Sequence, residues 1–433
     1  MSAQFYKFDN LKELSHTDGE IPFILDKQKN YYRALATDDF GSVDAFGRMR
    51  VSEPFTLFDS SHRYADNDLW VTATGGTGNA TFNAPRGLVD LNISTGFVSY
   101  IYRETKRVFP YQPGKSLLAM NTFTMSPPQT NLVQRVGYFS TGNGIFLEQS
   151  GSTLNFVERT YVSGSLMETK VPQLQWNGDK LNGSGHSEYN LDITKSQILW
   201  SDMEWLGAGS VRMGFVIDGK FITAHSFHHA NLIEGTYLTT ACLPLRYEIF
   251  NVGNISTSGN LKQICSTVIS EGGYELRGSQ QSIGTSITSA KTLTTAGTLY
   301  PLVSLRLKTD KLDAVVVPSA ASAITIDTSI CEWRLIEGGT TVGGTWANNG
   351  QNSAVEYNIS GTSITNGRTV AKGFISSSNQ SSSQIHLPKG ELLKFQLNRN
   401  SFTNTPSEFI LAISASTDNE IAYGSLDWEE ISR

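Results

Sequence analysis

Three consecutive runs decide the fold class, and they read ILWSDMEW at 198–205, SVRMGFVI at 210–217 and KFITAHSF at 220–227. The tetrapeptide LGAG separates the first two runs, and Asp218-Gly219 separates the second from the third. In the middle run Val211, Met213 and Phe215 recur at every second position, which places one face of a strand in a core. Because Asp-Gly is a favoured two-residue hairpin turn, the stretch predicts a three-stranded antiparallel meander.

The same strand and turn pattern continues on both sides of the meander. Residues 144–149 and 153–159 flank Ser150-Gly151-Ser152 and predict a hairpin. Residues 278–298 are rich in Ser, Thr, Gln and Gly without a wide apolar face, which indicates a domain boundary. Eight short β-rich runs follow, at 299–307, 314–317, 323–327, 331–336, 354–359, 369–376, 392–397 and 409–414.

Together these patterns predict an all-β protein with two β-sandwich or jelly-roll-like modules. The first module is expected at 44–280, with a concanavalin-like arrangement as one option, and the second at 281–433. Residues 1–43 mix Tyr, Phe, Lys and Asp, with one short helical stretch expected at 11–14, and are expected to form an extended arm.

Composition excludes several classes of function. The 433 residues suffice for at least two buried cores. A net charge of -6 disfavours a protein that grips nucleic acid by neutralising phosphates. No run approaches the roughly 18 to 20 apolar residues of a membrane span, and the first residues lack the apolar region of a signal peptide. Three widely spaced cysteines, Cys242, Cys265 and Cys331, predict neither a zinc site nor a disulfide framework.

Two carboxylates are candidates for chemistry. Asp202 and Glu204 are two residues apart in an expected strand, so both point to one face about 6.6 Å apart along the backbone. Glycosidases on concanavalin-like sandwiches use strand carboxylates in this way. Gly207 stands where the E-x-D-x-x-E run of such enzymes carries a third acid, and a solvated strand face is the preferred interpretation.

The densest histidine cluster is His225, His228 and His229. Two imidazoles three residues apart share a metal on a helix, but the preceding pattern is a strand that ends near Phe227. We therefore expect ordinary polar residues at a strand end, and the sequence predicts no catalytic, metal-binding or cofactor-binding residue.

Two further features suit ligands as well as folding. The basic run RETKR at 103–107 lies between aromatic residues, an arrangement found in single-strand nucleic-acid and acidic-glycan sites. An exposed edge strand guarded by charge is the preferred interpretation. Tryptophans stack sugars when exposed but are more often buried, and the chain has seven: Trp70, Trp176, Trp200, Trp205, Trp333, Trp346 and Trp428.

Three blocks carry a resemblance to a family. The first is FGRMRVSEPFTLFDS at 46–60, the second comprises EWLG at 204–207 and GFVIDGKF at 214–221, and the third comprises GGTW at 343–346 and SAVEYN at 353–358. In these blocks the chain resembles virion structural proteins of tailed bacteriophages. The resemblance implies no catalytic residue in these blocks.

The resemblance implies a non-enzymatic structural component of the virion, assembled in the host cytoplasm. A tail-associated position, as a baseplate, tail-tip or fibre component acting in assembly and host attachment, is favoured. The alternatives are a capsid decoration protein and a glycan-binding receptor module. The expected partners are other virion proteins, copies of the chain itself and a host surface glycan, without nucleic acid and without a cofactor.

Overall fold

The computed structural model describes residues 24–25, 31–32, 53–96, 98–326, 329–376, 383–386 and 394–432, and of 24–25, 31–32, 383–386 and 432 the backbone alone. The chain divides into two compact units, 1–53 and 54–433. In the first unit β1 (Ile24–Leu25) pairs with β2 (Tyr31–Tyr32). The rest of the expected arm, with its short helix, lies outside the described residues.

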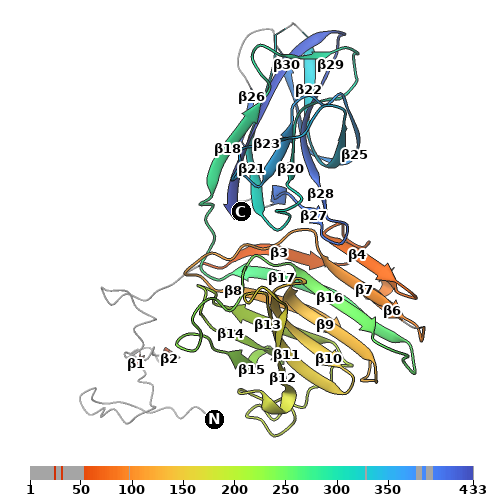
Figure 1. Cartoon of the computed structure of the whole chain (residues 1–433), viewed down its shortest axis with the longest axis vertical. Helices are drawn as coiled ribbons and strands as arrows, with labels where there is room; N and C mark the ends of the chain where they lie inside the picture. The colour runs from red at the N-terminus through yellow and green to blue at the C-terminus, as the bar shows by residue number, and fades with distance from the viewer. Residues whose placement is uncertain are drawn as a thin grey trace. The chain divides into compact units, whose positions relative to one another are not determined.

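The second unit begins with a sandwich of two antiparallel sheets (Figure 1). In order across the seven-stranded sheet lie β12 (Met167–Pro172), β11 (Thr153–Thr160), β10 (Gly144–Ser150), β9 (Leu132–Phe139), β16 (Leu245–Asn251), β7 (Tyr100–Thr105) and β4 (Trp70–Gly75). The eight-stranded sheet contains β15 (Lys220–Phe227), β14 (Val211–Ile217), β13 (Gln197–Met203), β8 (Leu117–Thr124), β17 (Gly259–Ser270), β6 (Leu88–Ile93) and β5 (Asn79–Asn83), with β3 (Phe55–Ser61) paired to β17.

A second sandwich follows along the chain. Its five-stranded sheet contains β18 (Ser279–Gly284), β30 (Glu420–Ser432), β21 (Val315–Thr325) and β26 (Ser383–His386), with β19 (Lys291–Leu293) paired to β30. Its six-stranded sheet contains β23 (Ala347–Asn348), β24 (Val355–Asn358), β20 (Tyr300–Leu307), β29 (Glu408–Ala415), β22 (Ile330–Val342) and β25 (Ser363–Ser376). The remaining named elements are the pair β27 (Arg399–Asn400) and β28 (Thr405–Pro406) and the 3-10 turns η2 (Ala84–Arg86) and η3 (Gln173–Gln175).

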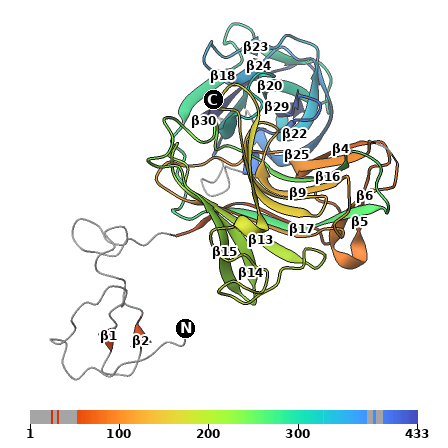
Figure 2. The same cartoon turned by 60° about the horizontal axis from the view of Figure 1, so that its bottom comes forward.

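The expected all-β class and the meander are confirmed, as are both modules' sandwich character. β13, β14 and β15 pair in antiparallel order (Figure 2). Val211, Met213 and Phe215 are fully buried in the core between the two sheets of the first sandwich. Asp218 and Gly219 both have positive φ, at 50° and 74°, which is the backbone that a tight hairpin turn requires.

The second sandwich departs from the sequence prediction in several places. The runs expected at 314–317 and 323–327 belong to one strand, β21, whose pairing with β30 shifts register at two points. Residues 394–397 of the run expected at 392–397 are not in a strand. The boundary expected at residue 280 falls inside β18, which pairs with β30.

A buried arginine connects the two sandwiches. The guanidinium of Arg399, on β27, is 2% exposed and donates to the carbonyl oxygen of Thr105 at 2.9 Å. It also pairs with Glu104 at 3.1 Å and with Asp313 at 2.8 Å. The backbone N–H of Arg399 donates to the carbonyl of Lys106 at 3.1 Å. Because these bonds leave the guanidinium with partners from both sandwiches, they fix one sandwich on the other.

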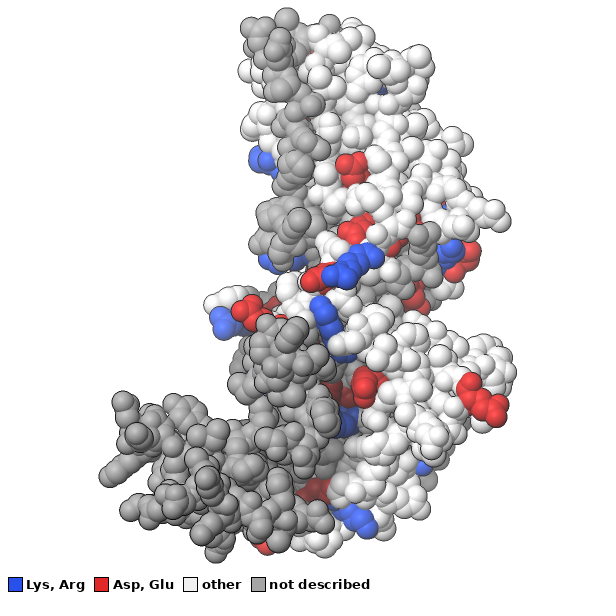
Figure 3. Space-filling view, turned by 90° about the vertical axis from the view of Figure 1, so that its left-hand side faces the viewer, with Lys and Arg blue, Asp and Glu red and all other residues white. Residues whose placement is uncertain are grey.

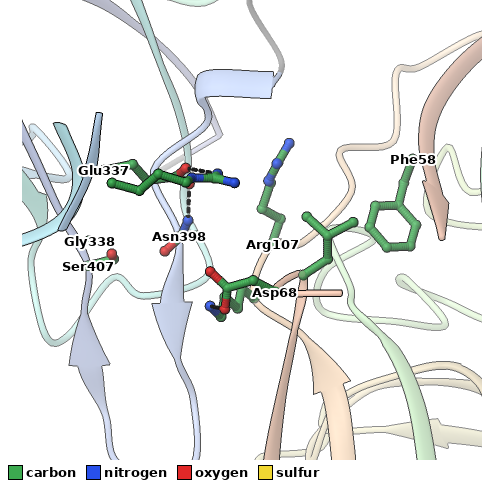
Figure 4. Close-up of a pocket in the computed structure, with 10 residues that line it drawn as sticks. Phe58, Asp68, Arg107, Glu337, Gly338, Asn398 and Ser407 are labelled. Carbon is green, nitrogen blue, oxygen red and sulfur yellow. Dashed lines mark hydrogen bonds and ion pairs between the residues drawn. The ribbon is translucent and has the colours of Figure 1, made fainter. Parts of the chain in front are cut away.

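A small enclosed hollow of about 60 Å³ lies beside this junction. Figure 4 shows Glu337 of the second sandwich accepting hydrogen bonds from Arg368 at 2.6 Å and from Asn398 at 2.7 Å. Phe58 and Asp68 of the first sandwich line the same hollow. The hollow is therefore part of the contact between the sandwiches, and its size suits one or two water molecules.

Candidate functional site

The three clustered histidines go to three different environments. His225 is 6% exposed on β15, stacks against Phe156 with ring centroids 6.4 Å apart, and accepts the backbone N–H of Asn177 at Nδ1. Burial, helped by the nearby charge of His228, lowers the pKa of His225 to about 4. The imidazole of His225 is therefore neutral at physiological pH and belongs to the core.

His229 is the opposite case. Its Nε2 lies 2.7 Å from a carboxylate oxygen of Glu158, and its Nδ1 lies 2.5 Å from the carbonyl oxygen of Gly209. Burial lowers the pKa of His229, but the bonds to Glu158 and Gly209 outweigh burial and raise it. Only His228 reaches an open surface, where its Nδ1 lies 3.2 Å from the Ser210 hydroxyl.

An open groove of about 530 Å³ lies over the end of the meander. Both candidate carboxylates, Asp202 and Glu204, line it together with His228, but the strand expected to carry both acids, β13, ends at Met203 and leaves Glu204 in the following turn. Leu199 and Met203 of β13 point into the core, so Asp202 lies on the outer face of the eight-stranded sheet. The other lining residues are Tyr111, Gly114, Lys115, Ser116, Leu206, Ser210, Arg212 and Ser226.

Asp202 is buried in the wall of this groove, and only one of its two carboxylate oxygens has a hydrogen-bond partner among the described residues. It is 6% exposed, and its Oδ2 pairs with Arg212, the residue opposite on β14. Its other neighbour in the register is Leu118 on β8, which has no side-chain donor. Oδ1 accordingly has no hydrogen-bond partner among the described residues. A buried carboxylate oxygen without a donor is costly, so a donor from a ligand or water is expected there.

Glu204 and the pair Ser210–His228 do not form a catalytic triad. Glu204 is exposed, and its carboxylate accepts the backbone N–H of Ser210 at 3.4 Å. A triad needs an acid on the second imidazole nitrogen, and no ion pair of His228 is present among the described residues. The groove thus offers several hydrogen-bonding groups around an open space. Groups of three or more His, Cys, Asp or Glu arranged to hold a metal are absent from the part of the chain that the structure describes.

Aromatic side chains continue the same sheet face beside the groove. Trp200 precedes Asp202 by two residues on β13, and its ring meets that of Phe221 on β15 edge to face at 5.5 Å. Gly214 lies opposite Trp200 on β14 and carries no side chain, which leaves room for the two rings to meet. Phe221 is 55% exposed and presents its ring to solvent.

A second hollow of about 420 Å³ adjoins the groove. The two share Tyr111 and Lys115, from the loop between β7 and β8. Tyr274, Glu275 and Arg277, which precede β18, line its far side. The groove and the second hollow therefore border the same loop of the first sandwich.

The outer face of the seven-stranded sheet also carries charges, but there each charged group has partners. Glu148 is fully buried and pairs with Lys170 at 2.8 Å and with Arg135 at 2.8 Å. Arg135 pairs in turn with Glu248 at 3.1 Å, and Glu248 with Arg246 at 2.6 Å. Burial alone would lower the pKa of Arg135, but Glu248 and Glu148 raise it.

This chain of ion pairs reaches the second sandwich. Arg246 pairs with Glu104, which also contacts Arg399 of the junction. The guanidiniums lie over aromatic rings as well, Arg135 over Phe146 at 5.4 Å and Arg246 over Phe402 at 5.2 Å. We name this row the ion-pair chain; its members in order are Lys170, Glu148, Arg135, Glu248, Arg246, Glu104, Arg399 and Asp313.

The basic run at 103–107 is not an exposed edge, and that prediction was wrong. β7 lies between β16 and β4 inside the seven-stranded sheet. Arg103 is buried toward the core, where it donates to the Gln263 side chain at 2.6 Å and to Thr72 at 2.7 Å. The two charges of this run that lie within β7 are tolerated inside a sheet because Arg103 meets Thr72 on β4 and Glu104 meets Arg246 on β16. Figure 3 shows positive and negative side chains interspersed on the face in view, without a basic patch.

Most tryptophans belong to the cores. Trp70, Trp176, Trp200, Trp333 and Trp428 are buried. Trp205 and Trp346 are partly exposed, and Arg306 lies 4.0 Å from the centre of the Trp346 ring. Cys265 and Cys331 are free thiols.

Sequence reasoning found the two acids of the groove and missed the rest of its wall. Arg212 was recoverable, because the short turn between the first two runs of the meander places it opposite Asp202. Tyr111 and Lys115 come from a loop some ninety residues earlier, and no local pattern links them to Asp202.

Comparisons with known proteins find similarity among solved structures alone. Neither a scan against protein-family models nor a search of curated proteins finds a match. Among solved structures, the chain is similar to a GH16 protein from Bacteroides ovatus described with mixed-linkage glucan, at 8% identity and TM-score 0.33, over 49% of this chain and 99% of that one.

Two further solved structures show likenesses of the same order. A protein of unknown function from Shewanella oneidensis MR-1 matches at 10% identity and TM-score 0.33, over 60% of this chain and all of that one. Peanut lectin matches at 10% identity and TM-score 0.26, over 51% of this chain and 98% of its own. All three TM-scores are low, so the fold rests on the chain's own strand pairing. No helix among the described residues is both long and apolar enough to cross a bilayer.

Proposed function

We propose that the chain is a non-enzymatic structural component of a tailed-bacteriophage virion, associated with the tail and acting in assembly and host attachment. Its partners in this proposal are other virion proteins and copies of itself. The resemblance described above supports the assignment. Described parts of its blocks contribute to β3, β14, β15 and β24, all of which belong to the four main sheets.

The observation that carries the proposal is the fixed junction between the sandwiches. A part of a tail transmits force between its neighbours, so two modules that flexed freely about a linker would serve poorly. Here Arg399 is buried with partners on both sides, and the side-chain amide of Gln396 donates to the carbonyl of Val108 at 3.0 Å. Buried charge pairs of this kind hold one arrangement because breaking them leaves an uncompensated charge.

Gold-labelled antibodies against the second sandwich, applied to intact particles, test the proposal. The expected result is label confined to the tail or its tip. Label spread over the shell would support a capsid decoration protein instead. Purified particles that contain no copy of the chain by mass spectrometry would overturn the virion assignment.

A specific observation favours a second function, a glycan-binding receptor module in the first sandwich. The groove is open and is lined by many hydrogen-bonding side chains, among them Asp202, whose buried Oδ1 has no partner among the described residues. Sugar hydroxyls both donate and accept, which suits such a lining. Binding of the assembled chain to purified host polysaccharide is expected, and a lack of binding by the intact oligomer would count against this function.

A further inference from the structure

We infer that the groove and the sheet face beside it bind a linear, uncharged polysaccharide, with a hydroxyl held by Asp202 and a sugar ring stacked on Phe221. This inference rests on the proposed glycan-binding function and adds to it the site, the charge and the shape of the ligand. Four features of the described residues carry it.

The anchor is Asp202. Its carboxylate is more than nine-tenths buried and lines the groove, with Arg212 holding one oxygen and nothing holding the other. A carboxylate oxygen accepts only, so the ligand atom opposite it must be a donor. A sugar hydroxyl fits, because it can donate to Asp202 while its own oxygen accepts from a neighbouring donor such as Arg212 or the Ser226 hydroxyl.

The stacking platform is Phe221. Its exposed ring rests edge to face against Trp200, which fixes the ring's orientation before any ligand arrives. Trp200 and Asp202 are two residues apart on the same face of β13, a spacing of roughly 6.6 Å, and Phe221 contacts Trp200 from β15. An extended ligand that crosses this face can therefore meet both the carboxylate and the aromatic ring.

The extent of the site indicates a chain rather than a single sugar. The groove and the second hollow lie on either side of Tyr111 and Lys115 and measure about 530 and 420 Å³. Each is within the range of a small-molecule site, and together with the Phe221 face they make a track for several sugar units.

The charges along the track favour an uncharged ligand. Its lining contains three cations, Lys115, Arg212 and Arg277, and three anions, Asp202, Glu204 and Glu275. Arg212 pairs with Asp202, and Arg277 pairs with Glu275. A track whose charges balance exerts no net attraction on an acidic or a basic polymer, and selection then falls to hydroxyl bonding and ring stacking.

The test is an array of purified bacterial surface polysaccharides, uncharged and uronic-acid-containing, probed with the full chain. Four variants are compared with the unchanged protein: Asp202→Asn, Phe221→Ala, and two matched controls. Asp59→Asn changes an exposed aspartate on β3 of the same sheet, and Phe374→Ala removes a phenylalanine that is 65% exposed in the second sandwich. Thermal unfolding of each variant confirms that it is folded.

The expected result is binding to at least one uncharged polysaccharide, weakened about tenfold or more by Asp202→Asn and by Phe221→Ala and unaltered by both controls. Binding that both groove variants leave unchanged would overturn the inference while the glycan-binding function stood. Binding restricted to the acidic polysaccharides would overturn it as well. Binding to no polysaccharide on the array would overturn both the inference and the glycan-binding function. Because Phe221 is exposed, its variant keeps the test decisive if Asp202→Asn fails to fold.

Discussion

The two outer faces of the first sandwich differ in how many oxygens of a buried carboxylate have a partner. On the seven-stranded sheet Glu148 is completely buried, and Lys170 and Arg135 occupy both of its oxygens. On the eight-stranded sheet Asp202 is nearly as buried, and Arg212 occupies one oxygen only. The residues on the neighbouring strands explain the difference. Glu148 lies opposite Arg135 on β9 and is reached by Lys170 from β12, whereas Asp202 has Arg212 on one side and Leu118 on the other.

The difference separates charges that serve the fold from charges that serve a ligand. A buried carboxylate with all its partners inside the protein stabilises one arrangement of strands and leaves no capacity for another molecule. A buried carboxylate with one free acceptor on an open groove keeps that capacity. Burial and charge alone therefore do not identify a binding site, and the count of satisfied acceptors does.

The largest effect is expected where the ion-pair chain is cut in its middle. Arg135→Leu removes a partner from both Glu148 and Glu248, whose side chains are 1% and 4% exposed. Leaving buried carboxylates short of a partner should lower the free energy of unfolding by about 3 to 5 kcal/mol, as measured by urea denaturation. Arg334→Leu is the control, because its pair with Glu332 is partly exposed and should cost at most about 1 kcal/mol. Equal losses of unfolding free energy for the two variants would show that the buried ion pairs stabilise the fold no more than an exposed pair does.

Arg399→Ala tests whether the chain of ion pairs also joins the two sandwiches. The variant removes the only member that contacts both Glu104 and Asp313. We expect a loss of about 3 kcal/mol and, in scanning calorimetry, two unfolding transitions in place of one. A single transition at the original temperature would show that other contacts hold the sandwiches together.

Two histidines show a similar contrast, between a buried group without a charged partner and one paired with a carboxylate, with a smaller effect. The pKa of His225 falls from 6.5 to about 4 on folding, so the unfolded chain binds the proton more tightly. Its contribution to stability is complete above pH 6.5 and is lost as the pH falls toward 4, on the order of 2 kcal/mol. His229, paired with Glu158, has a raised pKa, and its contribution is lost as the pH rises.

Urea denaturation across this pH range measures the His225 contribution. His225→Gln should flatten the fall in stability between pH 6.5 and 4, whatever the variant costs at neutral pH. An unchanged slope would show that carboxylates elsewhere in the chain produce it.

The fold was predictable where short-range rules suffice. Alternation at Val211, Met213 and Phe215 and the Asp218-Gly219 turn gave the meander and its core face. β30 was missed although it is thirteen residues long, because acidic residues interrupt its apolar pattern. One of them, Glu430, is buried where it accepts from Ser353 Oγ and from the backbone N–H of Ala354 at 2.9 Å. No pattern in the strand itself reveals partners that lie so far away in the sequence.

The candidate site was predictable only where its residues are close together in the sequence. Alternation along β13 places Asp202 on the outer face, since the period of a strand is local, but the strand ends at Met203 and Glu204 reaches the groove from the turn that follows. The free acceptor of Asp202 depends on Leu118, and the groove depends on the loop of Tyr111, both far away in the sequence. The three histidines diverge because only His225 lies in β15, whereas His228 and His229 follow the end of the strand.

The most direct measurement compares Asp202→Asn with Glu148→Gln by urea denaturation in the absence of any ligand. Both changes remove one buried carboxylate charge from an outer sheet face. The account predicts that Glu148→Gln lowers the free energy of unfolding by about 2 kcal/mol or more, whereas Asp202→Asn changes it by less than about 1 kcal/mol or raises it. A loss for Asp202→Asn as large as that for Glu148→Gln would contradict the account, because both carboxylates would then serve the fold.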